Sequence, residues 1–308
     1  MAALASALLD FAALVLLVRL TLPARFVSSN PYVAAMESLL ERLRRSLRPA
    51  FPRVPDAALH ALLLLLALAG QAALLARRGD NLLFFDSLAA LAFAPEGFAG
   101  WFGFALLRFA AFWLAILAGA CFLRLWRLGA PLPGLSGDLL RLAVRPVRAR
   151  SLWTLAPLTL LLALLFAAVA FRLADGVEWV FAEALGQALR DAAAPGADLA
   201  LLRAFSPAHA SAAGQILHLA GAFLLNAVER LPQLLLYLCV ASWLARLFRN
   251  GRMADFFADA IRLLTGALPP MRAGGLSFAP LAAWLLLNLL AAALSGALHL
   301  FLPLFHVV

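Results

Sequence analysis

Long apolar stretches alternate with short arginine-rich segments along the whole chain. A helix needs about 17 to 25 apolar residues to cross roughly 30 Å of hydrocarbon, and six stretches have such a length. They cover about 3–22, 57–76, 104–123, 152–171, 231–248 and 278–302. The pattern predicts an all-α polytopic membrane protein with about six transmembrane helices. A further apolar run at 212–228 is left open as a seventh span or a re-entrant helix.

Three segments between these stretches have amphipathic character. In 34–48 the apolar residues recur at helical intervals, and 138–150 shows the pattern more weakly. In 253–268 the apolar set opposes three charged residues: Phe256, Phe257, Ile261, Leu264 and Leu268 against Asp255, Asp259 and Arg262. Helices of this kind are expected to lie in the cytoplasmic membrane interface.

The composition agrees with a membrane protein. Hydrophobic residues make up 65% of the chain and charged residues 13%, and the mean hydropathy is +0.95. Soluble domains carry roughly a quarter charged residues. Cys121 and Cys239 fall inside apolar runs, where a free thiol behaves as a small hydrophobe, so no disulfide framework is indicated. The N-terminal stretch lacks the basic region of a signal peptide and is interpreted as a retained helix.

The charge pattern sets an expected orientation. The net charge is +9, and all 25 basic residues are arginine. Segments 23–56, 124–151 and 246–277 hold 17 of them, whereas 77–103 and 173–230 hold five. Because positive loops stay cytoplasmic, we expect arginine-rich cytoplasmic loops in a multi-pass protein of the bacterial inner membrane, with both termini outside. The expected partner of these loops is the anionic headgroup layer, and not a nucleic acid.

An internal repeat follows from three arginines. Arg19, Arg124 and Arg246 end the first, third and fifth stretches, and a proline follows each at Pro49, Pro146 and Pro270. Pro157 lies 33 residues after Arg124, and Pro280 lies 34 after Arg246. We therefore expect three repeated helical hairpins, each built from a span, an interfacial helix, a proline turn held at the headgroups by arginine, and a returning span. Arginines placed by topology alone explain this spacing less well.

The repeat divides the chain into five parts. These are a first unit, an outside connection, a second unit, an outside connection with amphipathic helices, and a third unit: 1–76, 77–103, 104–172, 173–230 and 231–308. Arg108 and Arg230 each stand 16 residues before a signature arginine, about 24 Å along a helix. We expect them to mark the outer ends of their spans, with short outside helices upstream.

The repeated motifs resemble the YggT family, also called YlmG, of small bacterial and plastid membrane proteins. That family combines a span ending in Arg, an Asn-Pro pair, an Arg-Pro turn and a Gly-Gly segment before the next span. The matching residues are Arg19, Asn30, Pro31, Arg48 and Pro49, then Arg124, Arg145, Pro146, Arg148 and Pro157, then Arg246, Pro270, Arg272, Gly274, Gly275 and Pro280. Ser277 and Ala279 depart from the family pattern, Asn-Pro occurs in unit one alone, and the family typically has two units.

The resemblance implies a non-enzymatic scaffold or assembly factor that organises envelope, division or respiratory membrane proteins. It also implies other membrane proteins as partners, and a homo-oligomer remains open. The residues agree, because no phosphate loop, zinc-protease motif, Cys-x-x-Cys or nucleophile elbow is present. We expect no enzyme activity, catalytic residue, metal or cofactor. Of the five histidines, only His299 and His306 stand seven apart; interfacial anchoring is favoured there, with a haem or metal role left open.

Two polar residues inside apolar stretches are the intramembrane candidates. Asp10 lies nine residues before Arg19, roughly 13 Å deep, and Asn288 lies eight residues after Pro280. They could meet as a polar pair or as part of an ion path, although an interhelical hydrogen bond is the favoured interpretation. An ion channel or transporter in ion or osmotic homeostasis is therefore the second hypothesis. Units of one orientation count against it, since many transporters use inverted repeats.

Overall fold

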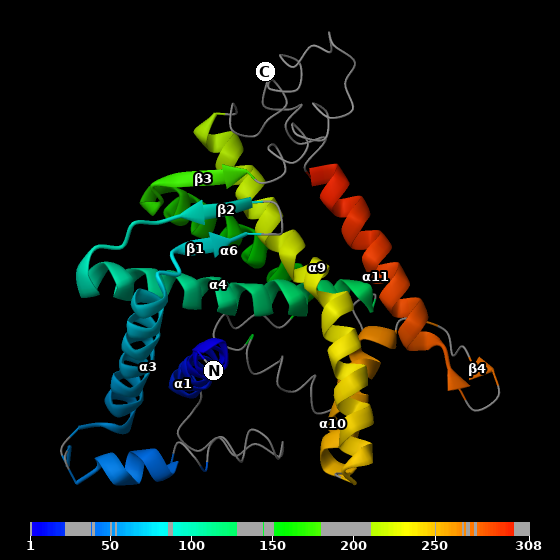
Figure 1. Cartoon of the computed structure of the whole chain (residues 1–308), viewed down its shortest axis with the longest axis horizontal. Helices are drawn as coiled ribbons and strands as arrows, with labels where there is room; N and C mark the ends of the chain where they lie inside the picture. Colours follow the sequence, from blue (N-terminus) through cyan, green and yellow to red (C-terminus); the bar gives the residue numbers. More distant parts are fainter. Residues whose placement is uncertain are drawn as a thin grey trace.

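Helices dominate the described part of the chain. The computed structural model describes residues 2–21, 38, 41–49, 51–52, 54–85, 89–127, 144, 151–179, 211–249, 251–266, 268, 272–273 and 276–298. Its long helices are α1 (Ala2–Thr21), α3 (Asp56–Arg78), α4 (Gly97–Trp126), α6 (Leu152–Leu173), α9 (Ala212–Leu247), α10 (Gly251–Thr265) and α11 (Ala279–Gly296). Figure 1 shows their arrangement.

Within the described residues, five helices are long and apolar enough to cross a membrane: α3, α4, α6, α9 and α11. The chain is therefore a multi-pass membrane protein. Each of these helices overlaps one of the apolar stretches predicted from the sequence, and α4 and α9 begin before theirs. The first predicted span is helical as α1, but it is not among the five, and its crossing of the membrane stays a prediction.

Helix α9 runs through a boundary that the sequence predicted. The residues at 212–228 and 231–248 form one helix of 36 residues, so the predicted outside connection 173–230 ends inside it. Ser211 caps its start by accepting a hydrogen bond from the Gly214 N–H. Pro232 stands in the interior and removes one backbone hydrogen bond, yet the helix continues because Leu231 and Leu235 are buried on both sides of the proline.

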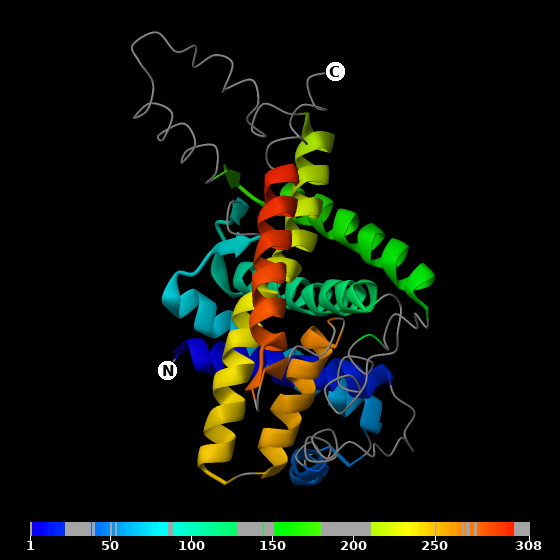
Figure 2. The ribbon, with the colours of Figure 1, turned by 90° about the vertical axis from the view of Figure 1, so that its right-hand side faces the viewer.

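The two long helices of each predicted hairpin pack on each other, but the three pairs run in different directions. α1 packs on α3, α4 on α6, and α9 on α11. Figures 1 and 2 show α9 and α11 running steeply side by side, whereas α4 lies across them and across α3. Superposition of the three units stays a prediction.

Two small sheets accompany the helices. β1 (Leu82–Phe84), β2 (Ala89–Ala92) and β3 (Gly176–Trp179) form an antiparallel sheet that joins the two outside connections. β4 (Arg272–Ala273) and β5 (Leu276–Ser277) form a short antiparallel pair before α11. In the described parts of the two outside connections, β1, β2 and β3 stand where short helices were expected. A physical reason is that β2 is buried along Ala89, Ala90 and Leu91, as suits a central strand covered on both faces.

The outer ends of α4 and α9 also differ from expectation. α4 begins at Gly97, so Arg108 lies inside the helix, and Arg230 lies inside α9. Both helices continue upstream of these arginines, and each arginine has a polar partner: Arg108 donates to Asp80 at 3.3 Å, and Arg230 donates to Asn226 at 2.8 Å. Arg108 and Arg230 therefore do not mark helix ends.

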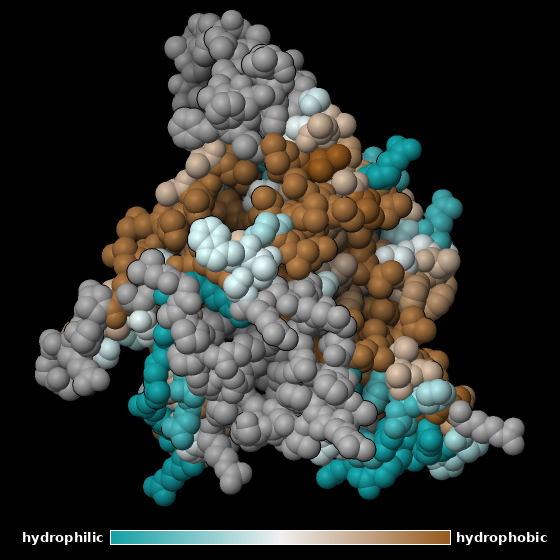
Figure 3. Space-filling view, turned by 180° about the vertical axis from the view of Figure 1, so that it is seen from behind, coloured by the Kyte–Doolittle hydropathy of each residue, from teal (hydrophilic) through white to brown (hydrophobic). Residues whose placement is uncertain are grey.

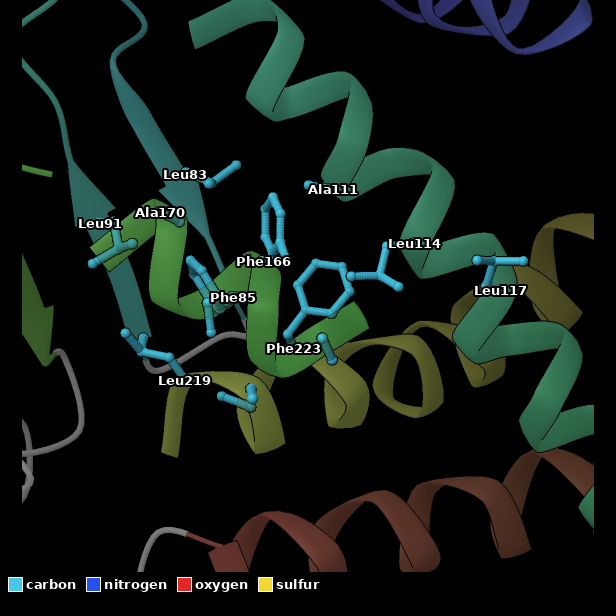
Figure 4. Packing of buried hydrophobic residues seen from close by; sticks show 14 of the residues in the cluster. Leu83, Phe85, Leu91, Ala111, Leu114, Leu117, Phe166, Ala170, Leu219 and Phe223 are labelled. Atoms are coloured by element: carbon cyan, nitrogen blue, oxygen red, sulfur yellow. The ribbon is translucent and has the colours of Figure 1, made fainter. Parts of the chain in front are cut away.

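The main core lies between α4, α6, α9 and the sheet. Phe85, which follows β1, Phe166 of α6 and Phe223 of α9 form a triangle of rings with centroids 5.3 to 5.9 Å apart. Leu114 and Leu117 of α4 are buried in the same cluster, as Figure 4 shows. This aromatic core fastens the sheet to the apolar helices.

The amphipathic segments are helical where they are described. Residues 41–47 are helical, and α10 forms over most of 253–268, with Leu263 and Leu264 buried on its apolar side. Of 138–150, the structure describes Val144 alone. α10 packs along the C-terminal half of α9 (Figure 2), whereas its predicted place in the membrane interface is untested.

Candidate functional site

A buried polar cluster joins α1 to α3. Ser6 and Asp10 stand four residues apart on α1 and therefore share one helix face. Gln71 of α3 is only 1% exposed. Its side-chain amide donates to the Ser6 hydroxyl at 2.7 Å and to the Asp10 carboxylate at 3.4 Å. We call Ser6, Asp10 and Gln71 the α1–α3 polar cluster.

The main chemical feature of this cluster is the Asp10 carboxylate, which accepts a hydrogen bond from Gln71. Carboxylates inside apolar surroundings are costly and need a donor or a counter-charge, and the Gln71 amide supplies a donor. The amide oxygen of Gln71 is buried and has no hydrogen-bond partner among the described residues. The cluster therefore offers one further acceptor position next to Asp10.

Arg108 extends the cluster towards α4. This arginine attracts Asp10 electrostatically and donates to Asp80 at 3.3 Å. Asp80 is placed there by the end of α3, where Gly79 adopts a left-handed conformation (φ 64°) and lets the chain reverse. Arg78 reaches the same carboxylate at 4.0 Å. An ion-pair network thus links the first helix pair to α4.

The second predicted polar residue lies elsewhere. Asn288 donates to the Trp284 carbonyl of its own helix at 2.7 Å, and no hydrogen bond joins it to Asp10 in the described structure. Asp10 instead accepts the interhelical hydrogen bond from Gln71 that was the favoured interpretation. Each residue forms its hydrogen bond with another group: Asp10 with Gln71, and Asn288 with Trp284. Sequence reasoning missed Ser6 and Gln71; a polar residue one helical turn before Asp10 and a glutamine inside 57–76 were the available signals.

The three signature arginines occupy matching local positions. Arg19, Arg124 and Arg246 each lie in the last turn of α1, α4 and α9. There a cation interacts favourably with the negative end of the helix dipole. Their placement at helix ends is as predicted, while a common membrane level is untested.

The signature prolines do not match so closely. Pro280 lies in the first turn of α11, where a missing N–H costs little. Pro157 lies inside α6, which starts earlier because Ser151 and Thr154 form a capping box. Arg272 stands in β4. The remaining signature residues fall outside the described residues: Asn30, Pro31, Arg145, Pro146, Arg148, Pro270, Gly274 and Gly275.

The first proline turn is held by ion pairs. Arg44 pairs with Asp56, the first residue of α3, and with Glu41 at 2.6 Å. Arg48, next to Pro49, donates to the Val54 carbonyl at 2.6 Å and to Asp56 at 3.3 Å. The hydrogen bond from Arg44 holds the pKa of the Glu41 carboxyl below its usual value. These arginines therefore bind protein groups, and their place at the lipid headgroups stays a prediction.

The described histidines stand apart. His60 lies on α3, His218 is buried on α9, and His209, His299 and His306 fall outside the described residues. Among the described residues, no group of three or more His, Cys, Asp or Glu could hold a metal ion. No protein-family model, curated protein or solved structure matches the chain. The resemblance to the YggT family stays a prediction.

Proposed function

We propose that the chain is a non-enzymatic scaffold or assembly factor of the YggT type. It would act in the bacterial inner membrane and organise envelope, division or respiratory membrane proteins. The observation that carries the proposal is an apolar stripe on the C-terminal half of α9. Its large side chains are exposed and recur at helical spacing: Leu236, Val240, Trp243 and Leu247.

The stripe has the chemistry of a surface for partner helices. Trp243 is 63% exposed, whereas Ser242 beside it is buried, so α9 turns its polar side chain inward and its largest apolar one outward. Helices in lipid associate through close van der Waals packing, and a bulky aromatic side chain supplies many such contacts. α11 adds a second exposed row at Leu281, Leu285 and Leu289.

The proposed orientation has cytoplasmic arginine-rich connections, anionic headgroups around them and both termini outside. Its support is the uneven distribution of arginines and the arginine in the last turn of α1, α4 and α9. Three YggT-like units are part of the same proposal.

Crosslinking in intact membranes tests the scaffold. We expect a partner membrane protein of fixed stoichiometry to be captured by the unaltered chain and lost with Trp243→Ala. Trp153→Ala is the matched control, since Trp153 is 90% exposed on α6, and it should keep the partner. No partner of fixed stoichiometry, or equal capture by both variants, would contradict the proposal.

An ion channel or transporter is the second candidate, and the α1–α3 polar cluster favours it. A carboxylate with a buried amide acceptor beside it is a group that can hold a cation or a proton. Ion flux into liposomes distinguishes the two functions: a transport site loses flux in Asp10→Asn while the protein stays folded. A scaffold keeps its partner in this variant, because an amide still accepts the hydrogen bond from Gln71.

A further inference from the structure

A cavity of about 490 Å³ lies between α4, α6, α9 and the end of α11. Cys121 and Leu125 line it from α4, Ala156 and Thr159 from α6, and Leu225 from α9. Ligand pockets in proteins commonly measure about 300 to 1,000 Å³, so the space is large enough for a ligand. Figure 3 shows a hollow within the apolar surface on the back of the molecule.

The wall of this cavity is suited to hydrocarbon. Its side-chain polar atoms are the Thr159 hydroxyl and the Cys121 thiol. The hydroxyl already donates to the Leu155 carbonyl of its own helix at 2.7 Å. An empty apolar space loses the dispersion contacts of the atoms around it. Because the cavity lies between helices apolar enough to span a bilayer, the medium available to fill it is lipid.

An arginine of α4 stands next to the cavity lining in sequence. Arg124 lies between the lining residues Cys121 and Leu125 in sequence, in the last turn of α4. The described ion pairs do not include Arg124. Trp153, in the first turn of α6, is exposed near the lining residue Ala156. Arginine and tryptophan together are typical of the level of lipid headgroups.

We propose that this cavity binds one acyl chain of an anionic phospholipid, with the lipid phosphate at Arg124. The site is separate from the α9 stripe and from the α1–α3 polar cluster. We therefore expect one lipid to stay with the protein during purification. Its acyl chain would bind in the cavity, and its headgroup would bind at the end of α4.

Native mass spectrometry after reconstitution with phosphatidylglycerol and phosphatidylethanolamine tests the site. The unaltered chain should retain one phosphatidylglycerol. Ala156→Phe fills the cavity and should lower retention roughly tenfold, the factor for about two methylene groups that lose their burial. Leu161→Phe is the control on α6, because Leu161 is 56% exposed and outside the lining. Arg124→Gln should keep a lipid but lose the preference for phosphatidylglycerol.

Photo-crosslinking checks the site in the unaltered chain, whatever the stability of Ala156→Phe. A phosphatidylglycerol with a photoreactive group in its acyl chain should label the lining segments 118–125, 156–160 and 221–228. Two results would overturn the proposal. One is labelling confined to the exposed row of α11, Leu281, Leu285 and Leu289. The other is equal lipid retention by Ala156→Phe and Leu161→Phe.

Discussion

The α1–α3 interface and the aromatic core around Phe223 are both buried, but their centres differ in chemistry. Gln71 hydrogen-bonds Ser6 and Asp10 at the first, while rings of Phe85, Phe166 and Phe223 meet at the second. In lipid, apolar burial alone gives little driving force between helices, so shape and hydrogen bonding decide. The stability of the aromatic core should therefore depend on side-chain volume. The stability of the α1–α3 interface should depend on single polar groups.

The largest effect is expected in the aromatic core. Phe223→Ala removes the ring that contacts Phe85 and Phe166 and should lower the free energy of unfolding by about 3 to 5 kcal/mol. Unfolding in mixed detergent and SDS micelles measures it. Phe11→Ala is the control, since Phe11 is exposed on α1, and it should cost much less. Equal losses in the two variants would show that volume does not hold this core.

A smaller effect is expected at the α1–α3 polar cluster. Gln71→Leu leaves Ser6 and Asp10 without their donor and should cost about 1 to 3 kcal/mol of unfolding free energy. Adding Ser6→Ala should recover part of this loss, because an unpaired hydroxyl is removed. If Gln71→Leu costs more than Phe223→Ala, the ranking of the two regions is reversed.

The ion pair that connects the two regions should matter less still. Arg108→Gln breaks the contact with Asp80, and partly exposed pairs are worth about 0.2 to 1 kcal/mol. Arg78→Gln is the matched control, because its contact with the same carboxylate is longer, and it should cost less in the same unfolding assay. A larger loss of unfolding free energy in Arg78→Gln would show that the Arg78–Asp80 contact, and not the Arg108–Asp80 contact, stabilises the fold.

The smallest effect concerns Glu41, whose ion pair lies near the surface. Its pKa in the folded protein is lowered from about 4.5, mainly by the hydrogen bond from Arg44. A lowered pKa stabilises the fold at pH values above 4.5, and this contribution is lost as the pH falls below 4.5 through the folded pKa. The Tm difference between the unaltered chain and Glu41→Gln should therefore shrink on acidification. A Tm difference that grows as the pH falls would contradict a lowered pKa of Glu41.

Apolar length was enough to predict where the helices lie, because each of α3, α4, α6, α9 and α11 overlaps a predicted span. Continuity was harder to predict. Helix α9 passes Pro232 because neighbouring leucines are buried in tertiary contacts, which sequence spacing does not contain. The sheet was missed for a similar reason, since β1 and β2 become a sheet with β3, more than eighty residues away.

The candidate site was predicted in part. Asp10 was recognised because a carboxylate in an apolar run needs a partner. Its partner was not, because depth along a helix does not tell which face meets which neighbour. Asn288 satisfied its amide within its own helix, whereas Gln71 lay on the face of α3 that contacts α1.

The length of α9 has a mechanical consequence. At 1.5 Å per residue it measures about 54 Å, against roughly 30 Å of hydrocarbon. A tilt that kept the whole helix inside would exceed the usual range of about 0 to 40°, so part of α9 must project from the hydrocarbon layer. Because the helix is unbroken, it acts as a stiff lever. A change in bilayer thickness that alters its tilt also moves α10, which is packed along its far end.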